Sequence, residues 1–356
     1  MFGVPFWRPP ATRYPGELPP AVDVLVIGGG ITGVSLLHHL TERRVSAVLV
    51  ERAHLASGAS GRNAGFLLAG VASSYAEAVR TYGRGKAREL WMMTAANHDA
   101  MLDAVKRAPD HYRRAGSDVL ASGPEEARAL EESAELLHED GIDVQWDGKK
   151  LFNPNDGELD PCSLVEGIAA SAPQDAIREG VEVDGLVSGS NSVDVSAGAR
   201  MCRAGKVLLA TNAYTPQLVP SVPIYPKRAQ MLATAAGGPR ADDVPNYSHH
   251  GYRYWRRLET GELLIGGWRD TALETEVGYD ERPTDDIQGR IEAHLPHLGA
   301  TGPITHRWAG TMGFTDDGLP LVGPLEGMRN VYLCAGFNGH GLGFAFLSAK
   351  ELVDRL

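Results

Sequence analysis

Cysteine is scarce in this chain of 356 residues. The three cysteines, Cys162, Cys202 and Cys334, are odd in number, lie far apart and show no C-x-x-C spacing. Neither a disulfide framework nor a zinc-binding cysteine motif is therefore expected, and a reducing compartment, the cytoplasm, fits this composition.

Long hydrophobic runs are also missing. No stretch of about 18 or more apolar residues occurs, so the sequence predicts no membrane-spanning helix. The first 20 residues are rich in proline and aromatic side chains and lack the basic-then-apolar order of a secretion signal. We expect them to form an extended arm on the protein surface or on a neighbouring subunit, with a transit function as the lesser alternative.

An excess of positive charge is the third absence. The formal net charge is -11 at pH 7, which argues against nucleic acid as the main partner. A hydrophobic content of 43% is ordinary for a globular protein, and the length is enough for about two domains. The sequence carries no signal for the number of subunits.

What the chain does contain is a glycine motif directly after a buried strand. Residues 22–27 are β-branched and aliphatic and predict a strand buried on both faces. Gly28, Gly30 and Gly33 then form G-x-G-x-x-G at the start of a predicted helix. This spacing allows a tight turn, close approach of the backbone to a pyrophosphate, and close packing of the helix on the strand.

A second strand strengthens this interpretation. Residues 47–50 predict a strand that ends at Glu51, 18 residues after Gly33 and near the spacing of about 20 expected for a ribose-binding acid. The order of strand, glycines, helix, strand and acid favours a dinucleotide site over a merely structural turn. The motif fits a nicotinamide and a flavin dinucleotide equally well.

The remaining chain alternates helices and strands. The small residues at 57–65 predict either a loop that contacts the cofactor or a flexible surface loop. A strand, a glycine cluster and a helix recur from residue 330 onward, which could bring a second helix N-terminus to the same ligand. Predicted helices cover 85–108, 124–139, 161–172 and 285–298; predicted strands cover 181–187, 192–197, 206–210 and 330–335, with a strand pair in 142–152 and a hairpin in 251–268.

These segments together resemble the D-amino acid oxidase superfamily of flavoproteins, which includes glycine oxidase and sarcosine oxidase. Within it, the chain looks most like the γ-glutamylputrescine oxidase branch. The resemblance covers nearly the whole chain from about residue 21. It rests on VIGGGITG at 26–33, Glu51-Arg52, SGASGRNAGF at 57–66, LLATNAYTP at 208–216, HHGYRYW at 249–255, WAGTMGFTDDGLPLVG at 308–323 and GFNGHGLGFA at 336–345.

The resemblance implies an α/β fold in which a Rossmann-like FAD-binding domain is interleaved with an α+β substrate domain on a mixed antiparallel sheet. The implied FAD-binding domain comprises residues 21–80, 150–215 and 305–356, and the substrate domain comprises 81–149 and 216–304. The implied FAD contacts are Gly28, Gly30, Ile31, Thr32, Gly33, Glu51, Arg52, Ser60, Gly61, Arg62, Asn63, Ala64, Gly65, Val183, Ala210, Thr211, Gly310, Gly339, Gly341, Leu342 and Gly343.

Two departures from the family pattern affect the chemistry. Sarcosine oxidases bond the flavin through a cysteine at the position of Gly310, so FAD is expected to be non-covalent here. D-amino acid and glycine oxidases use an arginine, at the position of Met312, to hold the substrate carboxylate. Its replacement favours a substrate recognised through its amine and tail, although Arg253, Arg256 or Arg62 could hold a carboxylate from elsewhere.

Candidate substrate contacts are mainly aromatic. On a regular strand Tyr252, Tyr254 and His250 would point to one side, and with Trp268 they could wall an apolar site or simply form a packed sheet face. An apolar site would favour the uncharged amine that hydride transfer needs. His340 and Asn338 are further candidates, as a base and as a hydrogen-bonding group, although a histidine at such a position is more often a neutral structural group.

The leading prediction is an FAD-dependent oxidase of a primary or secondary amine. Hydride would pass from the carbon next to nitrogen to flavin N5, the imine would hydrolyse, and O2 would be reduced to H2O2. Three alternatives stay open at this point: an FAD-dependent dehydrogenase with another electron acceptor, an NAD-dependent dehydrogenase, and a non-catalytic flavin-binding protein.

Overall fold

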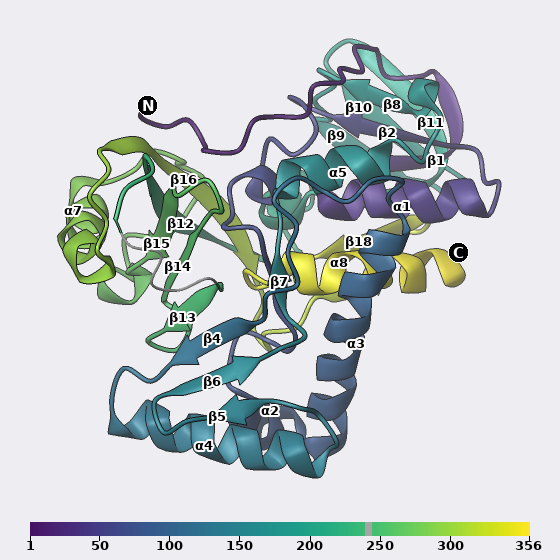
Figure 1. Cartoon of the computed structure of the whole chain (residues 1–356). Helices are drawn as coiled ribbons and strands as arrows, with labels where there is room; N and C mark the ends of the chain where they lie inside the picture. Colours follow the sequence, from purple (N-terminus) through teal and green to yellow (C-terminus); the bar gives the residue numbers. More distant parts are fainter. Residues whose placement is uncertain (239–243) are drawn as a thin grey trace.

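The computed structural model describes residues 1–238 and 244–356, whose strands form two large sheets (Figure 1). The first sheet has the order β17-β18-β11-β1-β2-β8, and β10 and β9 extend it beside β11. Its strands are β1 (Ala21–Ile27), β2 (Ala47–Glu51), β8 (Ile177–Glu179), β9 (Gly185–Ser188), β10 (Val193–Ala197), β11 (Arg200–Leu209), β17 (Leu321–Pro324) and β18 (Val331–Ala335).

The predicted glycine-motif strand is the centre of this sheet. β1 pairs in parallel with β11 on one side and β2 on the other, and β11 pairs in parallel with β18. Because parallel strands present their carboxyl ends at one edge, the turns after β1 and β18 both lie at that edge. The two glycine-rich turns are therefore brought together by the pairing of the sheet.

The helix that follows the glycine motif packs on this sheet together with two other helices. α1 (Ile31–Glu42) is buried from Ile31 to Leu40 and packs against α5 (Pro161–Ala169) and α8 (Gly341–Asp354). Asp160 caps α5 by accepting from the backbone N–H of Cys162 at 2.8 Å. Figure 1 shows α1 and α5 against the first sheet, with α8 on the other side of α1.

The second sheet has the order β16-β12-β15-β14-β13-β4-β6-β5. α7 (Asp285–His294) packs on β12 and β15, while α2 (Tyr75–Tyr82), α3 (Arg84–Asp103) and α4 (Pro124–Glu139) surround the β4–β6 end. Its strands are β4 (Ser117–Leu120), β5 (Gln145–Trp146), β6 (Lys150–Asn153), β12 (Tyr225–Thr234), β13 (Asn246–Ser248), β14 (Arg253–Arg257), β15 (Leu263–Gly267) and β16 (Ile304–Phe314); β3 (Phe66–Leu67) pairs with β7 (Gly157–Glu158), and α6 (Thr215–Leu218) is a single turn.

This architecture agrees with the predicted fold class. The predicted domain ranges stay a prediction. β6 and β16 are both strands of the second sheet, although the ranges 150–215 and 305–356 assign them to the FAD-binding domain. The helix at 124–139 and the hairpin of β14 and β15 are as predicted. The first half of the strand predicted at 181–187 is wrong, because residues 181–184 belong to no strand and β9 begins only at Gly185. The Val181 N–H instead bonds Glu51 O at the end of β2.

Three predicted helices are shorter in the structure. The helix predicted at 161–172 ends at Ala169. The helix predicted at 85–108 ends at Asp103, and α2, which was not predicted, precedes it. The helix predicted at 285–298 ends at His294 and continues as a 3₁₀ turn, Leu295–Leu298, in which Pro296 lacks the N–H that an α-helical bond would need.

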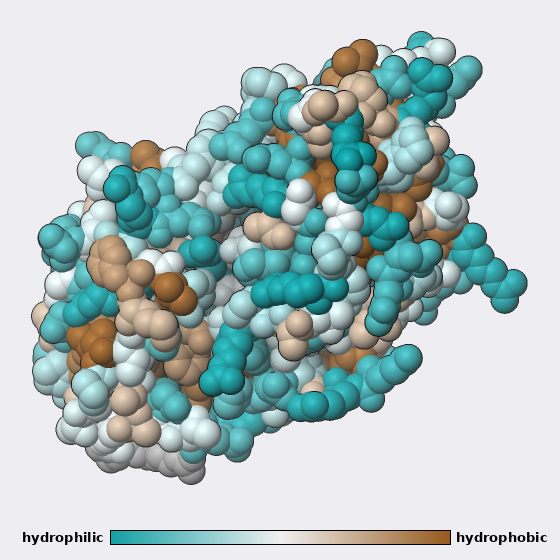
Figure 2. All heavy atoms as spheres, turned by 90° about the horizontal axis from the view of Figure 1, so that it is seen from above, coloured by the Kyte–Doolittle hydropathy of each residue, from teal (hydrophilic) through white to brown (hydrophobic). Residues whose placement is uncertain are grey.

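The N-terminal arm lies on this chain's own surface. Trp7, Tyr14 and Leu18 are buried, and Trp7 Nε1 donates to Asn63 O at 2.7 Å. Gly3 N–H bonds Arg307 O on β16, so the arm crosses from the first sheet to the second. Among the described residues no helix is long and apolar enough to cross a membrane, and hydrophobic residues form only small patches on the face in Figure 2.

The helical glycine Gly33 offers a test of this packing. A Cβ at Gly33 would lie 1.8 Å from Gly28 O, so Gly33→Ala is expected to destabilise the protein by about 1–3 kcal/mol or more. Gly289, in α7, has nothing within 4 Å of its Cβ position, so Gly289→Ala should stabilise by roughly 0.5–1 kcal/mol. Thermal unfolding of both variants measures the difference; equal shifts in Tm would contradict it.

Candidate active site at the junction of the two sheets

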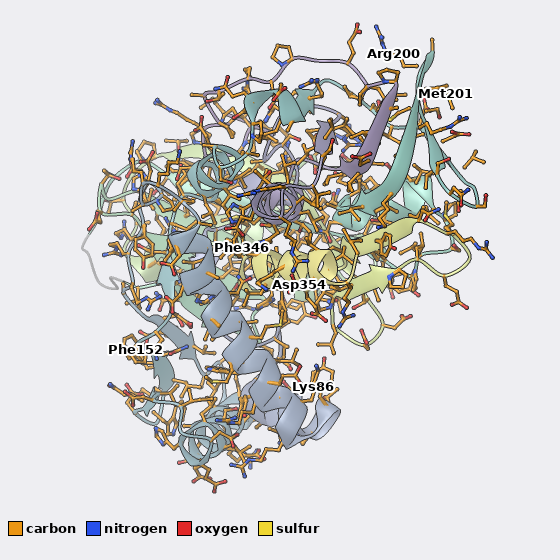
Figure 3. All side chains as sticks on the ribbon, turned by 90° about the vertical axis from the view of Figure 1, so that its right-hand side faces the viewer. Lys86, Phe152, Arg200, Met201, Phe346 and Asp354 are labelled. Atoms are coloured by element: carbon orange, nitrogen blue, oxygen red, sulfur yellow. The ribbon has the colours of Figure 1, made fainter. Side chains whose placement is uncertain are left out.

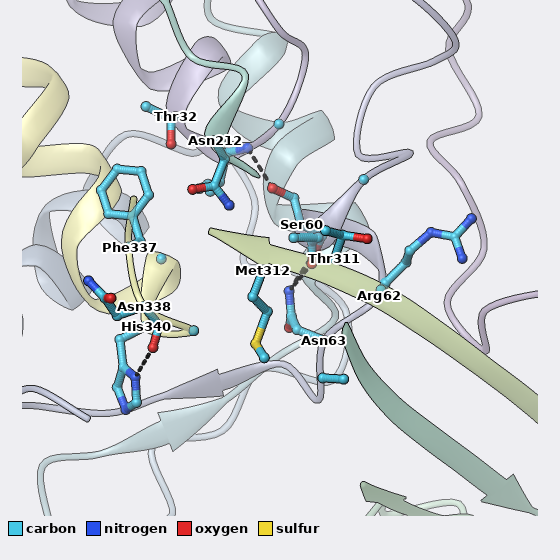
Figure 4. Close-up of a pocket in the computed structure, with 18 of the residues that line it drawn as sticks. Thr32, Ser60, Arg62, Asn63, Asn212, Thr311, Met312, Phe337, Asn338 and His340 are labelled. Atoms are coloured by element: carbon cyan, nitrogen blue, oxygen red, sulfur yellow. Dashed lines mark hydrogen bonds between the residues drawn. The ribbon is translucent and has the colours of Figure 1, made fainter. Parts of the chain in front are cut away.

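One cavity of about 760 Å³ joins the two glycine-rich turns. Residues 28–32 line it from the N-terminal turn and residues 337–343 from the C-terminal turn. Figure 4 shows Phe337, Asn338 and His340 on one side, Ser60 and Asn63 on the other, and Met312 between them. The volume is typical of a ligand site, and its position at the carboxyl edge of the parallel strands is where such sheets bind ligands.

The N-terminal turn is shaped to receive a pyrophosphate. Gly28 has φ +113°, and its N–H bonds Val50 O at 2.9 Å. α1 begins after Gly30 with no side-chain cap and no acidic residue in its first turn. A Cβ at Gly30 would come within 2.9 Å of Ser60 Oγ, which accepts from the Ile31 N–H at 2.9 Å. Residues 28–32 line the cavity, so the N-terminus of α1 faces it, which favours a bound anion.

Glu51 closes the far side of the same turn. Its Oε2 accepts from Gly29 N–H at 2.7 Å, and its Oε1 accepts from Ala53 N–H at 2.9 Å and Ser57 Oγ at 3.2 Å. The buried carboxylate is thus fixed in place at the cavity wall. This arrangement fits a dinucleotide whose ribose hydroxyls donate to Glu51.

The C-terminal turn repeats the design with different residues. Asn338 and Gly339 have φ +53° and +85°, and α8 then starts without a side-chain cap. A Cβ at Gly343 would lie 3.1 Å from Leu68 O, so α8 approaches the loop after β3 closely. Backbone groups from a second helix start are thereby presented to the same cavity.

Most residues expected at the cofactor do line the cavity. The exceptions are Gly33, Gly61 and Gly65, which pack away from it: their Cβ positions would lie 1.8 Å, 2.3 Å and 2.1 Å from backbone oxygens of Gly28, Ala56 and Leu159. The lining members are Gly28, Gly30, Ile31, Thr32, Glu51, Arg52, Ser60, Arg62, Asn63, Ala64, Val183, Ala210, Thr211, Gly310, Gly339, Gly341, Leu342 and Gly343.

Arg52 and Gly310 have neighbours that the sequence did not reveal. The Arg52 guanidinium lies over the ring of Tyr214, 4.2 Å from its centroid. Gly310 is covered by Arg62, whose Cβ would lie 3.0 Å from a Cβ at Gly310. No cysteine is among the residues that line the cavity within the described chain, which agrees with a non-covalent cofactor.

Asn338 and His340, the two polar candidates in the C-terminal turn, differ in how far their side chains are already hydrogen-bonded within the protein. Asn338 Oδ1 accepts from Thr315 N–H at 2.9 Å, and its Nδ2 donates to Gly336 O at 2.8 Å. Its amide therefore holds the turn together, and a hydrogen bond from Asn338 to the flavin or substrate stays a prediction. His340 lines the cavity, and burial lowers the pKa of its imidazole, so His340 is neutral at pH 7.

The other end of the cavity is aromatic. Tyr252 and Tyr254 line it with His250, as predicted, but regular strand alternation is not the reason, because β14 begins at Arg253 and His250 has φ +54°. Tyr247, which was not predicted, packs on Tyr254 with ring centroids 5.7 Å apart. Burial raises the pKa of Tyr254 to about 12.

Trp268 is not a wall of this site. It is 5% exposed and packs with Leu232 and Ile265 in a core on the far side of the hairpin. Its positive φ of +60° turns the next residue, Arg269, into the cavity instead. This conformation was not predictable from the alternation of the strand.

None of the three arginines proposed to hold a carboxylate is available. Arg256 is fully buried and donates to Gly65 O and Leu159 O, and Arg253 lies over Trp268 outside the lining. Arg62 lines the cavity, but its guanidinium is bound to Ser57 O, Ala309 O and the carboxylate of Glu281.

Arg269 is the cation that sequence reasoning missed. Its guanidinium lies between the rings of Tyr252 and Phe314, 5.0 Å and 4.9 Å from their centroids. Within residues 1–238 and 244–356 no carboxylate pairs with it. It lines the cavity together with Met312, so a cation does stand at the aromatic end, on a different element from the family's arginine.

Two glycine-rich turns on one cavity are typical of a dinucleotide-binding protein. The model of the FAD-dependent oxidoreductase family matches residues 23–355, so the chain belongs to this family. This match confirms the predicted family and FAD as its cofactor, and it excludes the NAD-dependent alternative.

Individual relatives agree with this assignment. The chain is 28% identical to a tRNA 5-methylaminomethyl-2-thiouridine biosynthesis bifunctional protein of Maricaulis maris, over 96% of this chain and 54% of that protein. It is 27% identical to γ-glutamylputrescine oxidoreductase of Escherichia coli, over 94% of this chain and 83% of that protein. The crystal structure of glycine oxidase from Geobacillus kaustophilus has the same fold, with a TM-score of 0.78 and 20% identity over 95% of both chains.

Substitution of Glu51 tests the cofactor end of the cavity. In Glu51→Gln one carboxylate oxygen becomes an NH2 group, which cannot accept the hydrogen bond that a backbone N–H now donates to that oxygen. FAD affinity should therefore fall by about tenfold or more. Glu182→Gln is the matched control, because Glu182 lines the same cavity but is exposed. FAD retained after dialysis measures the effect; equal retention in both variants would refute the role of Glu51.

Proposed function

We propose that this chain is an FAD-dependent oxidase of a primary or secondary amine whose substrate also carries a carboxylate. The observation that carries the second part is Arg269, an unpaired guanidinium held between two aromatic rings in the cavity. The first part is supported by the family and by the relative named for γ-glutamylputrescine, which has both an amine and an amino-acid carboxylate.

The aromatic end of the cavity suits an uncharged amine. Tyr247, Tyr254 and Phe66 contact one another with centroids 5.4 to 6.4 Å apart. Burial raises the pKa of both phenols, so neither supplies a negative charge that would keep an alkylammonium protonated. Desolvation among these rings therefore favours loss of the amine proton before oxidation.

Arg269 would orient the substrate by binding its carboxylate, at the end away from the reacting amine. A guanidinium offers a planar fork of donors that matches a carboxylate in two hydrogen bonds. The rings of Tyr252 and Phe314 hold this fork without using its N–H groups. A carboxylate bound there would place the amine of the same molecule within the aromatic end.

The remaining chemistry is divided between the cofactor and the protein. When bound, FAD supplies a two-electron acceptor for the hydride that leaves the carbon next to nitrogen. The protein positions the amine, excludes water from the rings of the cavity, and keeps His340 neutral and able to accept a proton. The imine product would hydrolyse in water, and O2 would take up the electrons as H2O2.

Anaerobic reduction of the flavin tests the proposed donor. Amines with a carboxylate, among them γ-glutamylated amines, should bleach the flavin absorbance, and readmitted O2 should restore it with one H2O2 per turnover. Failure of every amine and amino acid in the panel would refute the amine assignment. Bleaching without reoxidation by O2 would instead support a dehydrogenase with another acceptor.

Substitution of Arg269 tests the proposed carboxylate contact. Arg269→Met should lower kcat/KM for a carboxylated amine by about 10- to 100-fold, mainly through KM, because a charge-assisted pair is lost. Arg269→Lys should recover part of this loss. The same variants should leave an amine without a carboxylate unaffected.

Arg253 provides the control for this experiment. It also packs on an aromatic ring, with its guanidinium 5.0 Å from the Trp268 centroid, but it does not line the cavity. Arg253→Met should therefore leave both substrates unchanged. An equal loss in Arg253→Met and Arg269→Met would assign the effect to packing of the hairpin.

A further inference from the structure

A cluster of two histidines and a glutamate lies at the C-terminal end of α1, far from the cavity. His38 Nε2 is 3.5 Å from Glu42 Oε2, and His39 Nδ1 is 3.4 Å from the same oxygen. The three atoms all lie within 4.8 Å of one another. The imidazoles are 10% and 6% exposed, while the Glu42 side chain is 63% exposed and reaches solvent.

Hydrogen bonds on the outer side of each ring determine its tautomer. Ser171 Oγ donates to Ile168 O at 2.6 Å, so at 2.7 Å from His38 Nδ1 it is left to accept, and Nδ1 carries the proton. His39 Nε2 lies 3.1 Å from Phe346 O, which only accepts, so Nε2 carries the proton in that ring. The nitrogen lone pairs, on His38 Nε2 and His39 Nδ1, therefore both point to Glu42.

Three electron-rich atoms thus converge on one point, which is unfavourable unless a cation lies between them. A proton could supply that charge, but burial lowers the pKa of both imidazoles more than Glu42 raises it, and His38 lowers the pKa of His39 further. Both rings also pack on Phe346, with centroids 5.3 Å and 4.4 Å away. The rings are oriented as metal-bound histidines are, with the other nitrogen donating to a second group.

The surroundings favour a cation, and within the part of the chain that the structure describes no lysine or arginine pairs with Glu42. The site is in the last turn of α1, where the helix dipole is negative. Arg43, which follows α1, and Lys350 on α8 are both paired with Asp354. Figure 3 shows Phe346 and Asp354 on α8, beside the end of α1.

We propose that His38 Nε2, His39 Nδ1 and Glu42 Oε2 bind a divalent transition metal, with Zn²⁺ the best match. Ligand atoms of a tetrahedral zinc site lie about 3.4 Å apart, given bonds of roughly 2.1 Å, and the two histidine-to-glutamate distances agree with this. Three protein ligands leave the fourth position to water. α1 has 12 residues and spans about 18 Å, so the metal would stabilise this helix and not take part in the oxidation.

Calorimetric titration of the FAD-loaded protein with ZnCl2 tests the proposal. Saturable binding of one Zn²⁺ per chain and a rise in Tm are expected, and MgCl2 should give neither, because nitrogen ligands do not suit Mg²⁺. Binding should weaken as the pH falls, since protons compete for the same nitrogens. Absence of saturable Zn²⁺ binding would overturn the site.

Variants locate the metal. Glu42→Gln removes an exposed ligand without touching the core and should abolish most of the Zn²⁺ affinity, whereas Glu351→Gln, another exposed helical carboxylate, should retain it. Ser171→Ala leaves all three ligands in place and should weaken binding by about tenfold, because the ring of His38 loses its orientation.

A second histidine pair serves as the control for adventitious binding. His294 and His297 stack with centroids 5.3 Å apart near α7. His297→Gln should leave the stoichiometry and the affinity unchanged. Zn²⁺ binding that persists in Glu42→Gln and disappears in His297→Gln would place the metal on α7 and overturn the proposal.

Discussion

The close approach of α1 to the turn after β1 is the constraint on which the rest of the structure depends. No atom larger than hydrogen fits between Gly33 and Gly28 O, and a Cβ at Gly28 would itself meet Ala210 O at 2.7 Å. These contacts pin α1, β1 and the end of β11 into one rigid unit. The helix N-terminus must therefore open at the carboxyl edge of the sheet, where the β18–α8 turn also arrives.

A second constraint joins the second sheet to the β3–β7 pair. Arg256 on β14 is fully buried, donates to Gly65 O and Leu159 O, and lies 3.5 Å from the carboxylate of Glu158 on β7. Burial lowers the pKa of its guanidinium to about 10, so it remains charged at neutral pH. Because removal of one partner of a buried ion pair leaves the other charge uncompensated, this contact fixes the aromatic end against the cofactor end.

The predictable and unpredictable parts of the site differ in how local they are. The glycine motif, Glu51 and the recurrent strand–turn–helix at the C-terminus follow from short spacings, and the structure brings them to one cavity. Arg269 was missed because its direction depends on a left-handed residue at Trp268, which period-two alternation does not reveal. Gly61 and Gly65 were assigned to the cofactor because a glycine needed for packing looks the same in sequence as one needed for a ligand.

The histidine cluster was missed for a related reason: its meaning lies in contacts between elements. The lone pairs of His38 and His39 are directed at Glu42 by a serine beyond α5 and a carbonyl on α8, and neither partner is near them in the sequence. α1 therefore has an electrostatic function at each end, since its N-terminus faces the cavity that suits an anion and its C-terminus collects ligands that suit a cation. Both follow from the direction of one helix dipole, because the sheet that orients α1 toward the pyrophosphate also determines which charge its other end attracts.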